Sequence, residues 1–225
     1  MEPQTTFKDI ITNRHVLIWG SVCIGIVALL AGLAYFSTPE PVFKGVTAPG
    51  VTESDWVRGD RTAAKAVLVE YSDFECPACA FYAPMLKKLE EETKGEVVVA
   101  YRHFPLTRIH PRAPLAARAA EAAGIQGKFF EMHDELFSNQ TTWSKESDPR
   151  NIFIEYAKKI GLNETQFIQD LDSDALKTKI ALAEQEGKNL GLTGTPSFFI
   201  NGTQITPTNS YAEFKERVLA EVNKQ

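Results

Sequence analysis

Cysteine is scarce in this sequence, with three residues among 225. So few cannot form the dense disulfide framework that stabilises small secreted domains. Cys23 lies in an apolar N-terminal stretch, which leaves one closely spaced pair, Cys76 and Cys79, for the rest of the chain. We therefore expect these two cysteines to be present for their reactivity and not for structural cross-linking.

An excess of basic charge is also missing. The chain has 24 Lys and Arg against 29 Asp and Glu, a formal net charge of -5. Nucleic-acid binding normally needs a basic patch, so we expect no nucleic-acid partner. The hydrophobic content of 44% and charged content of 24% are ordinary for a globular protein and argue against disorder. This length allows one large domain or two small ones.

Charge is absent from residues 16–36, an apolar run long enough to cross a bilayer as a helix. We predict a single-pass transmembrane signal anchor there, with residues 1–15 as a cytoplasmic segment and the remainder exported. A cleaved signal peptide is the alternative, since Gly32-Leu33-Ala34 offers small residues near a possible cut. The run exceeds a usual signal core, which favours a retained anchor. Residues 37–55, rich in Pro and Gly breaks, read as a linker to a domain over 56–225.

The centre of that domain is a strand followed by a helix that opens on the two cysteines. Val67-Leu68-Val69 is typical of a buried strand. Pro77 suits the first turn of a helix, where its missing N–H is not needed. Cys76 then lies at a helix N-terminus, which favours a thiolate and lowers the pKa of its thiol. Cys79 lies one turn further and can close a disulfide, so the chemistry indicated is thiol–disulfide exchange.

The other elements surround this unit. Residues 97–101 predict a second strand, and about ninety residues without strand signals follow, which we read as four or five short helices over about 110–190. Strands return at 197–200 and 203–205, joined by Asn201-Gly202, a strong hairpin signal. A final helix is expected over 211–222. The order is β-α-β, helical insertion, β-β-α, a mixed sheet with helices on its faces.

This pattern resembles the thioredoxin fold, and the insertion resembles the DsbA-like branch of exported thiol:disulfide oxidoreductases. The sequence Cys76-Pro77-Ala78-Cys79 matches the active-site motif of that family. Thr195-Pro196, after Gly194, matches the loop whose proline is cis and lies against the disulfide. Glu70, six residues before Cys76, matches the buried acid beneath the site, and Pro84 matches a proline of the active-site helix. The resemblance covers roughly residue 56 to the C-terminus.

The resemblance implies an enzyme that oxidises the cysteine thiols of substrate proteins without a cofactor or metal. Cys76 is expected to be the sulfur that substrates attack, and Glu70 the general base for Cys79. The Thr195 backbone is expected to pair with an extended substrate segment beside Pro196. A DsbB-like membrane partner would reoxidise the pair. We expect a monomer held at the cell membrane, with its catalytic domain on the extracytoplasmic side.

Three other readings remain open from the sequence. A reductase or isomerase of the same fold would use the same cysteines at a different reduction potential. A membrane-tethered chaperone or binding module would use the surface around the site without redox turnover. A zinc-binding module would use the cysteine pair with histidines, although no second cysteine pair is present.

Overall fold

The computed structural model describes residues 18, 22–29 and 50–224, and the chain divides into two compact units, Met1–Lys44 and Gly45–Gln225. Within the first unit, residues 22–29 are helical. Among the described residues, no helix has both the length and the apolar character needed to cross a membrane. Most of the anchor predicted at 16–36 lies outside the described residues, so the anchor stays a prediction.

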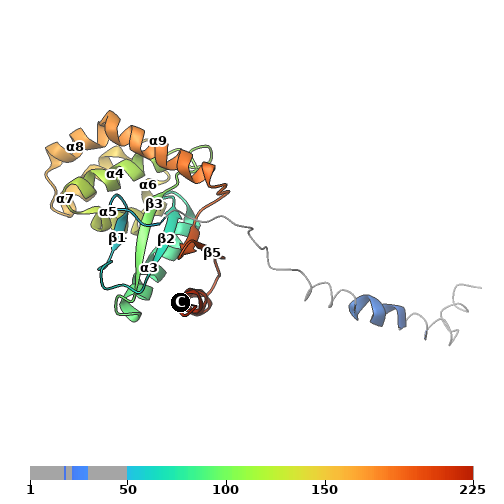
Figure 1. Ribbon diagram of the computed structural model, residues 1–225. Coiled ribbons are helices and arrows are strands. Elements are labelled where there is room, and N and C mark those ends of the chain that lie inside the picture. Colours follow the sequence, from blue (N-terminus) through green and yellow to red (C-terminus); the bar gives the residue numbers. More distant parts are fainter. Residues whose placement is uncertain (1–17, 19–21, 30–49, 225) are drawn as a thin grey trace, which may run out of the picture. The chain divides into compact units, whose positions relative to one another are not determined.

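The described part of the second unit is built on one mixed sheet with the strand order β1-β3-β2-β4-β5 (Figure 1). The central strand β2 pairs in parallel with β3 and antiparallel with β4, while β1 and β5 form the antiparallel edges. The strands are β1 (Trp56–Arg58), β2 (Ala66–Ser72), β3 (Val97–His103), β4 (Ser197–Ile200) and β5 (Thr203–Ile205). The predicted order β-α-β, helical insertion, β-β-α is confirmed, with β1 as an additional first strand.

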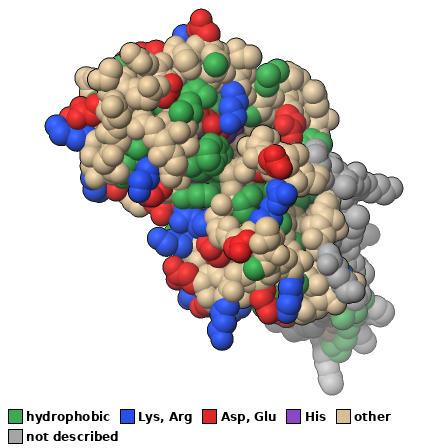
Figure 2. All heavy atoms as spheres, turned by 60° about the vertical axis from the view of Figure 1, so that its left-hand side comes forward, with side chains coloured by type: hydrophobic (Ala, Val, Ile, Leu, Met, Phe, Trp, Pro, Cys, Tyr) green, Lys and Arg blue, Asp and Glu red, His purple; other side chains and the backbone are tan. Residues whose placement is uncertain are grey.

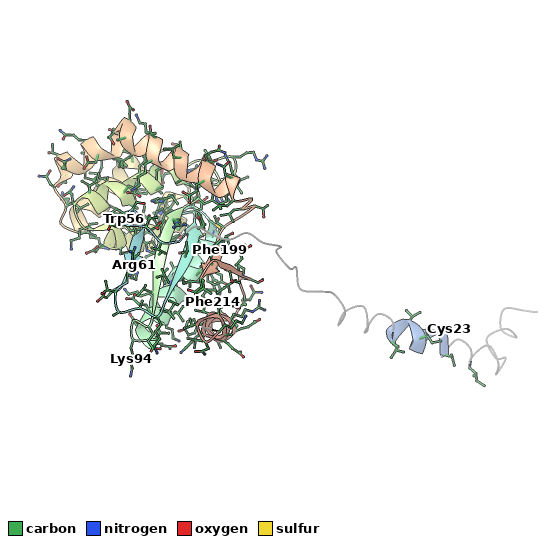
Figure 3. The ribbon with its side chains drawn as sticks, in the orientation of Figure 1. Cys23, Trp56, Arg61, Lys94, Phe199 and Phe214 are labelled. Atoms are coloured by element: carbon green, nitrogen blue, oxygen red, sulfur yellow. The ribbon has the colours of Figure 1, made fainter. Side chains whose placement is uncertain are left out.

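Each face of the sheet has its own core. Helices α3 (Pro77–Glu92) and α10 (Tyr211–Val222) contribute to the core of one face, to which Phe214 belongs. Phe199, labelled in Figure 3 with Phe214, belongs to the core of the other face. Leu190 and Leu192 also pack in that core. Gly187 of α9 (Asp174–Asn189) allows the close approach there, because a Cβ on it would lie 2.3 Å from the Phe104 ring.

The insertion between β3 and β4 forms a helical block above the sheet in Figure 1. Its core is continuous with the cysteine site, since Phe74, Cys76 and Cys79 pack in the same cluster as its buried alanines and aromatics. Besides α9, the block contains α4 (Ala113–Ile125), α5 (Phe129–Ser138), α6 (Gln140–Trp143), α7 (Arg150–Lys159) and α8 (Glu164–Asp172). The sequence predicted four or five helices; α6, one turn long, is the one it missed.

The sequence also did not predict the edge strand β1, which begins at Trp56. Both Trp56 and Asp55, the last residue of the predicted linker, contact the rest of the domain. Trp56 stacks on Phe129 with ring centroids 4.6 Å apart and donates from Nε1 to Glu121 at 2.9 Å. Asp55 forms an ion pair with the buried Arg102 at 2.6 Å. A three-residue strand has too few positions to show an alternating pattern, so tertiary contacts, and not local sequence, define it.

Candidate active site

Cys76 lies at the N-terminus of α3, as predicted. It is the N-cap residue, in extended conformation, and Pro77 occupies the first helical turn. Its side chain is nearly buried, and its sulfur lies 3.3 Å from the Thr195 carbonyl oxygen. The Thr195–Pro196 bond is cis, as expected, and lies in the loop between α9 and β4. The structure therefore brings residues 119 positions apart into contact at one sulfur.

The surroundings of Cys76 favour its thiolate. The nearby Cys79 thiol, Thr195 side chain and backbone amides of Cys79 and Ala78 lower the pKa of Cys76 to about 6, against the opposing effect of burial. Unpaired amides at a helix N-terminus are the usual source of such stabilisation. A thiol with this pKa is largely ionised at neutral pH.

Cys79 has the opposite character. It has no exposed surface, and burial, together with the neighbouring Cys76 and Glu70, raises the pKa of its thiol well above the ordinary value. The two sulfurs therefore differ both in access and in protonation. A substrate can reach Cys76 but not Cys79.

Glu70 lies buried beneath the cysteines. It is 1% exposed, and burial raises the pKa of its carboxyl to about 8, opposed by a hydrogen bond from Ser72. Its charge acts on both Cys76 and Cys79. An acid with this pKa near the sulfurs can hold or release a proton at neutral pH, which is the property that its predicted role requires.

Two acidic residues in the loop before Cys76 are paired with other groups. Asp73 accepts from the Leu106 amide at 2.8 Å and from His110 Nδ1 at 2.7 Å. Glu75 accepts from the Arg112 amide at 2.7 Å and forms an ion pair with its guanidinium at 3.2 Å. These carboxylates thus bind the segment after β3.

Gln140 is a site residue that the sequence did not reveal. Its side-chain amide donates to the Phe74 carbonyl at 2.7 Å and to the Cys76 carbonyl at 2.9 Å, and the residue is buried. The helical insertion thereby fixes the loop that carries the reactive sulfur. No local sequence signal distinguishes this glutamine from others, because its partners are backbone atoms 64 and 66 residues away.

Among the described residues, the histidines and cysteines do not form a metal site. His133 is buried in an aromatic cluster with Phe74, Tyr101 and Phe137, as predicted, and bonds to Asp134. Within the described residues, no group of three or more His, Cys, Asp and Glu side chains is placed to hold a metal ion.

A thioredoxin-type sheet, a cysteine pair at a helix N-terminus and a cis-proline opposite it define a thioredoxin-like redox site. Comparison with known proteins agrees: residues 52–219 match the family model described as thioredoxin, and the chain belongs to that family. Its fold is that of the DsbA-type oxidoreductases. Oxidised BdbD from Bacillus subtilis superposes with a TM-score of 0.68 at 21% identity, covering 79% of this chain and 97% of that one. Wolbachia pipientis alpha-DsbA1 superposes with a TM-score of 0.67 at 22% identity, covering 77% of this chain and 94% of that one.

Curated relatives with higher sequence identity than these solved structures are longer proteins, named as antiporters. The chain is 40% identical over 172 residues to the Na(+)/H(+) antiporter NhaA 1 of Mycobacterium sp. (strain KMS). The match covers 75% of this chain and 27% of that protein. The chain therefore spans about a quarter of the length of this relative.

Proposed function

We propose that this thiol–disulfide oxidoreductase is an oxidant that introduces disulfides into exported proteins. The observation that supports the proposal most is the Cys76 thiolate, stabilised at the start of α3 and in contact with the cis-proline loop. The more the protein stabilises this thiolate, the more the reduced form is favoured and the stronger the oxidant becomes. Asp73 and Glu75, the acidic residues closest to Cys76 in the sequence, are bonded to His110 and Arg112.

The reaction begins when a substrate thiolate attacks the Cys76 sulfur of the Cys76–Cys79 disulfide. Cys79 leaves, and a mixed disulfide forms between the substrate and Cys76. A second substrate thiolate attacks the substrate sulfur of that bond and releases Cys76 as a thiolate. The substrate leaves with a new disulfide, and the enzyme has gained two electrons. The Thr195 backbone, beside Cys76, offers a strand-like edge for an extended substrate segment.

We further propose that the domain works as a monomer at a membrane surface on the extracytoplasmic side, where a DsbB-like membrane protein reoxidises it. The uncharged run at 16–36 supports an anchor. The relatives of similar sequence are named Na(+)/H(+) antiporters, and a comparable segment forms about a quarter of such a longer protein there. An anchor would raise the local concentration of a membrane-bound oxidising partner.

The proposal is tested by the reduction potential of the cysteine pair, measured by equilibration with glutathione. We expect a value near that of DsbA, about −120 mV, and rapid oxidation of a reduced, unfolded substrate. A value near that of thioredoxin, about −270 mV, would assign the protein to reduction and contradict the proposal.

Two cysteine variants provide the controls. Cys76→Ser is expected to abolish oxidation of the substrate. Cys79→Ser, incubated with a substrate protein that already contains a disulfide, is expected to accumulate the mixed disulfide through Cys76, because the second thiol that would resolve it is absent. If the double serine variant performs the same cellular function as the wild type, the domain is a chaperone or binding module. Metal analysis of the purified protein distinguishes a zinc module.

A further inference from the structure

Ser72 lies beside Glu70 and has no role in the reaction steps proposed above. It lies two residues after Glu70 on β2, so the two side chains point to the same face of the sheet. The Ser72 hydroxyl donates to Glu70 Oε1 at 2.9 Å, and each residue is 1% exposed. The hydroxyl is therefore fixed against the carboxyl in a region closed to bulk water.

Cys79 reaches the same place from α3. Its sulfur accepts from the backbone amide of Asp73, the residue directly after Ser72, at 3.5 Å. The Ser72 side chain also acts on the Cys79 thiol and on the Tyr101 hydroxyl of β3, and in each case it opposes the rise in pKa that burial causes. The hydroxyl that is bonded to the buried acid thus belongs to the residue next to the one whose amide holds the leaving sulfur.

A proton must move in this region during turnover, because Cys79 changes between disulfide and thiol while having no exposed surface. A serine hydroxyl both donates and accepts hydrogen bonds, so it can receive a proton from one neighbour as it gives one to the other. We propose that the Ser72 hydroxyl relays a proton between the Glu70 carboxyl and the Cys79 sulfur in each disulfide exchange. This inference rests on the proposed function and names a further catalytic residue for it.

The step balances as follows. The substrate thiolate donates its electron pair to Cys76, the Cys76–Cys79 bond breaks, and the Cys79 sulfur takes the bonding pair. That sulfur accepts the Ser72 hydroxyl proton while the Ser72 oxygen accepts the Glu70 proton, which leaves Cys79 as a thiol and Glu70 as a carboxylate. On reoxidation the proton returns by the same route, and the electrons pass to the oxidising partner.

Other groups also act on the Glu70 carboxyl and must be separated from the relay. Arg58 on β1 favours its ionised form, whereas the Cys76 thiolate on α3 opposes it. Cys79, also on α3, and Tyr101 on β3 face it as well. Substituting Ser72 leaves all of these charges in place, so Ser72 variants report on the hydroxyl itself.

The experiment measures the rate at which dithiothreitol reduces the oxidised full-length protein between pH 5 and pH 9, divided by the thiolate fraction of the reagent. Each reaction is quenched with acid and its free thiols are counted. We expect Ser72→Ala to be about tenfold slower near pH 6, part of the total that general acid catalysis provides. For the wild type, the rate divided by the thiolate fraction should fall as pH rises past about 8, where Glu70 loses its proton. For Ser72→Ala, this corrected rate should not change with pH.

Further variants separate catalysis from folding. Ser72→Thr keeps the hydroxyl and should restore most of the rate. The Ser72→Ala/Glu70→Gln double variant should be no slower than Ser72→Ala, because both residues act in one relay. Ser210→Ala, a matched substitution at the start of α10 where the side chain forms no cap bond, should react like the wild type.

Three results would overturn the relay. Ser72→Ala could match the wild type while Glu70→Gln is slow, which means that the acid reaches Cys79 without Ser72; the proposed function would then stand. Ser72→Ala could be slow but keep the wild-type pH profile, which indicates a structural role. If the wild type and Ser210→Ala both fail to exchange with the reagent, the proposed function itself fails.

Discussion

The buried Glu70 carboxyl links the chemistry of the site to the stability of the fold. It is a carboxyl placed on the central strand, where burial disfavours its ionised form and raises its pKa to about 8. The folded protein therefore keeps a proton on Glu70 at pH values where the unfolded chain has released it. This difference makes stability depend on pH.

We expect the free energy of unfolding of the oxidised protein to decrease as pH rises above about 4.5, by up to about 1.4 kcal/mol per pH unit from this group, until pH reaches the raised pKa of Glu70. The sign follows because the native state binds more protons than the unfolded state in this range. Glu70→Gln removes the titration, so its stability should exceed that of the wild type at pH 7. Urea unfolding of both proteins at several pH values measures the difference, and parallel pH curves would contradict it.

At the scale of elements, α6 matters because Gln140 joins the insertion to the cysteine loop. Gln140→Met keeps the shape of the side chain but leaves the buried carbonyls of Phe74 and Cys76 without this donor. We expect a loss of about 1–3 kcal/mol in stability and a rise in the pKa of Cys76 from about 6, because the loop no longer holds the sulfur against the helix amides. Ultraviolet absorbance of the thiolate measures the pKa.

The matched control for this prediction is Gln126→Met. Gln126 belongs to the same insertion, but its amide bonds to the backbone of Asn163 at an exposed position. Its substitution should leave the pKa of Cys76 unchanged. An equal shift in both variants would show that the insertion acts through its general stability and not through Gln140.

The edge strand β1 depends on a buried ion pair at its start. Asp55→Ala removes the carboxylate that binds Arg102, which keeps Tyr71 and the Gly50 carbonyl as acceptors. We expect the free energy of unfolding to fall by about 3 kcal/mol, the low end for a broken buried pair, because those acceptors remain. Asp60→Ala, at a fully exposed turn, should reduce the free energy of unfolding far less than Asp55→Ala does. Both free energies of unfolding are measured with denaturant. Equal losses in the two variants would contradict the prediction that the Asp55–Arg102 ion pair stabilises the fold.

The elements that the sequence predicted correctly are those with local signals. The proline after Cys76 marks the start of α3, and Asn201-Gly202 forms the β4–β5 turn with both residues at positive φ. The missed elements, β1 and α6, are short and defined by distant partners. The same distinction applies to the site: motif and spacing indicate Cys76, Cys79, Glu70 and the cis-proline loop, but Gln140 and Ser72 gain their positions only through folding.

For the whole molecule, the division into two units makes a simple prediction. Every contact described for the cysteine site comes from residues within the second unit, Gly45–Gln225. We expect residues 45–225, expressed alone, to keep the melting temperature, the Cys76 pKa and the reduction potential of this unit. A change in potential on removal of residues 1–44 would show that the first unit acts on the site.

The inaccessibility of Cys79 determines what happens to a substrate that has a single cysteine. Such a chain can form the covalent complex at Cys76 but has no second thiol with which to leave. Cys79, held next to that bond and shielded from every outside thiol, can displace the chain and close the enzyme's own disulfide again. The enzyme thus releases a substrate with a single cysteine without help from another thiol, and the mixed disulfide with such a substrate is short-lived.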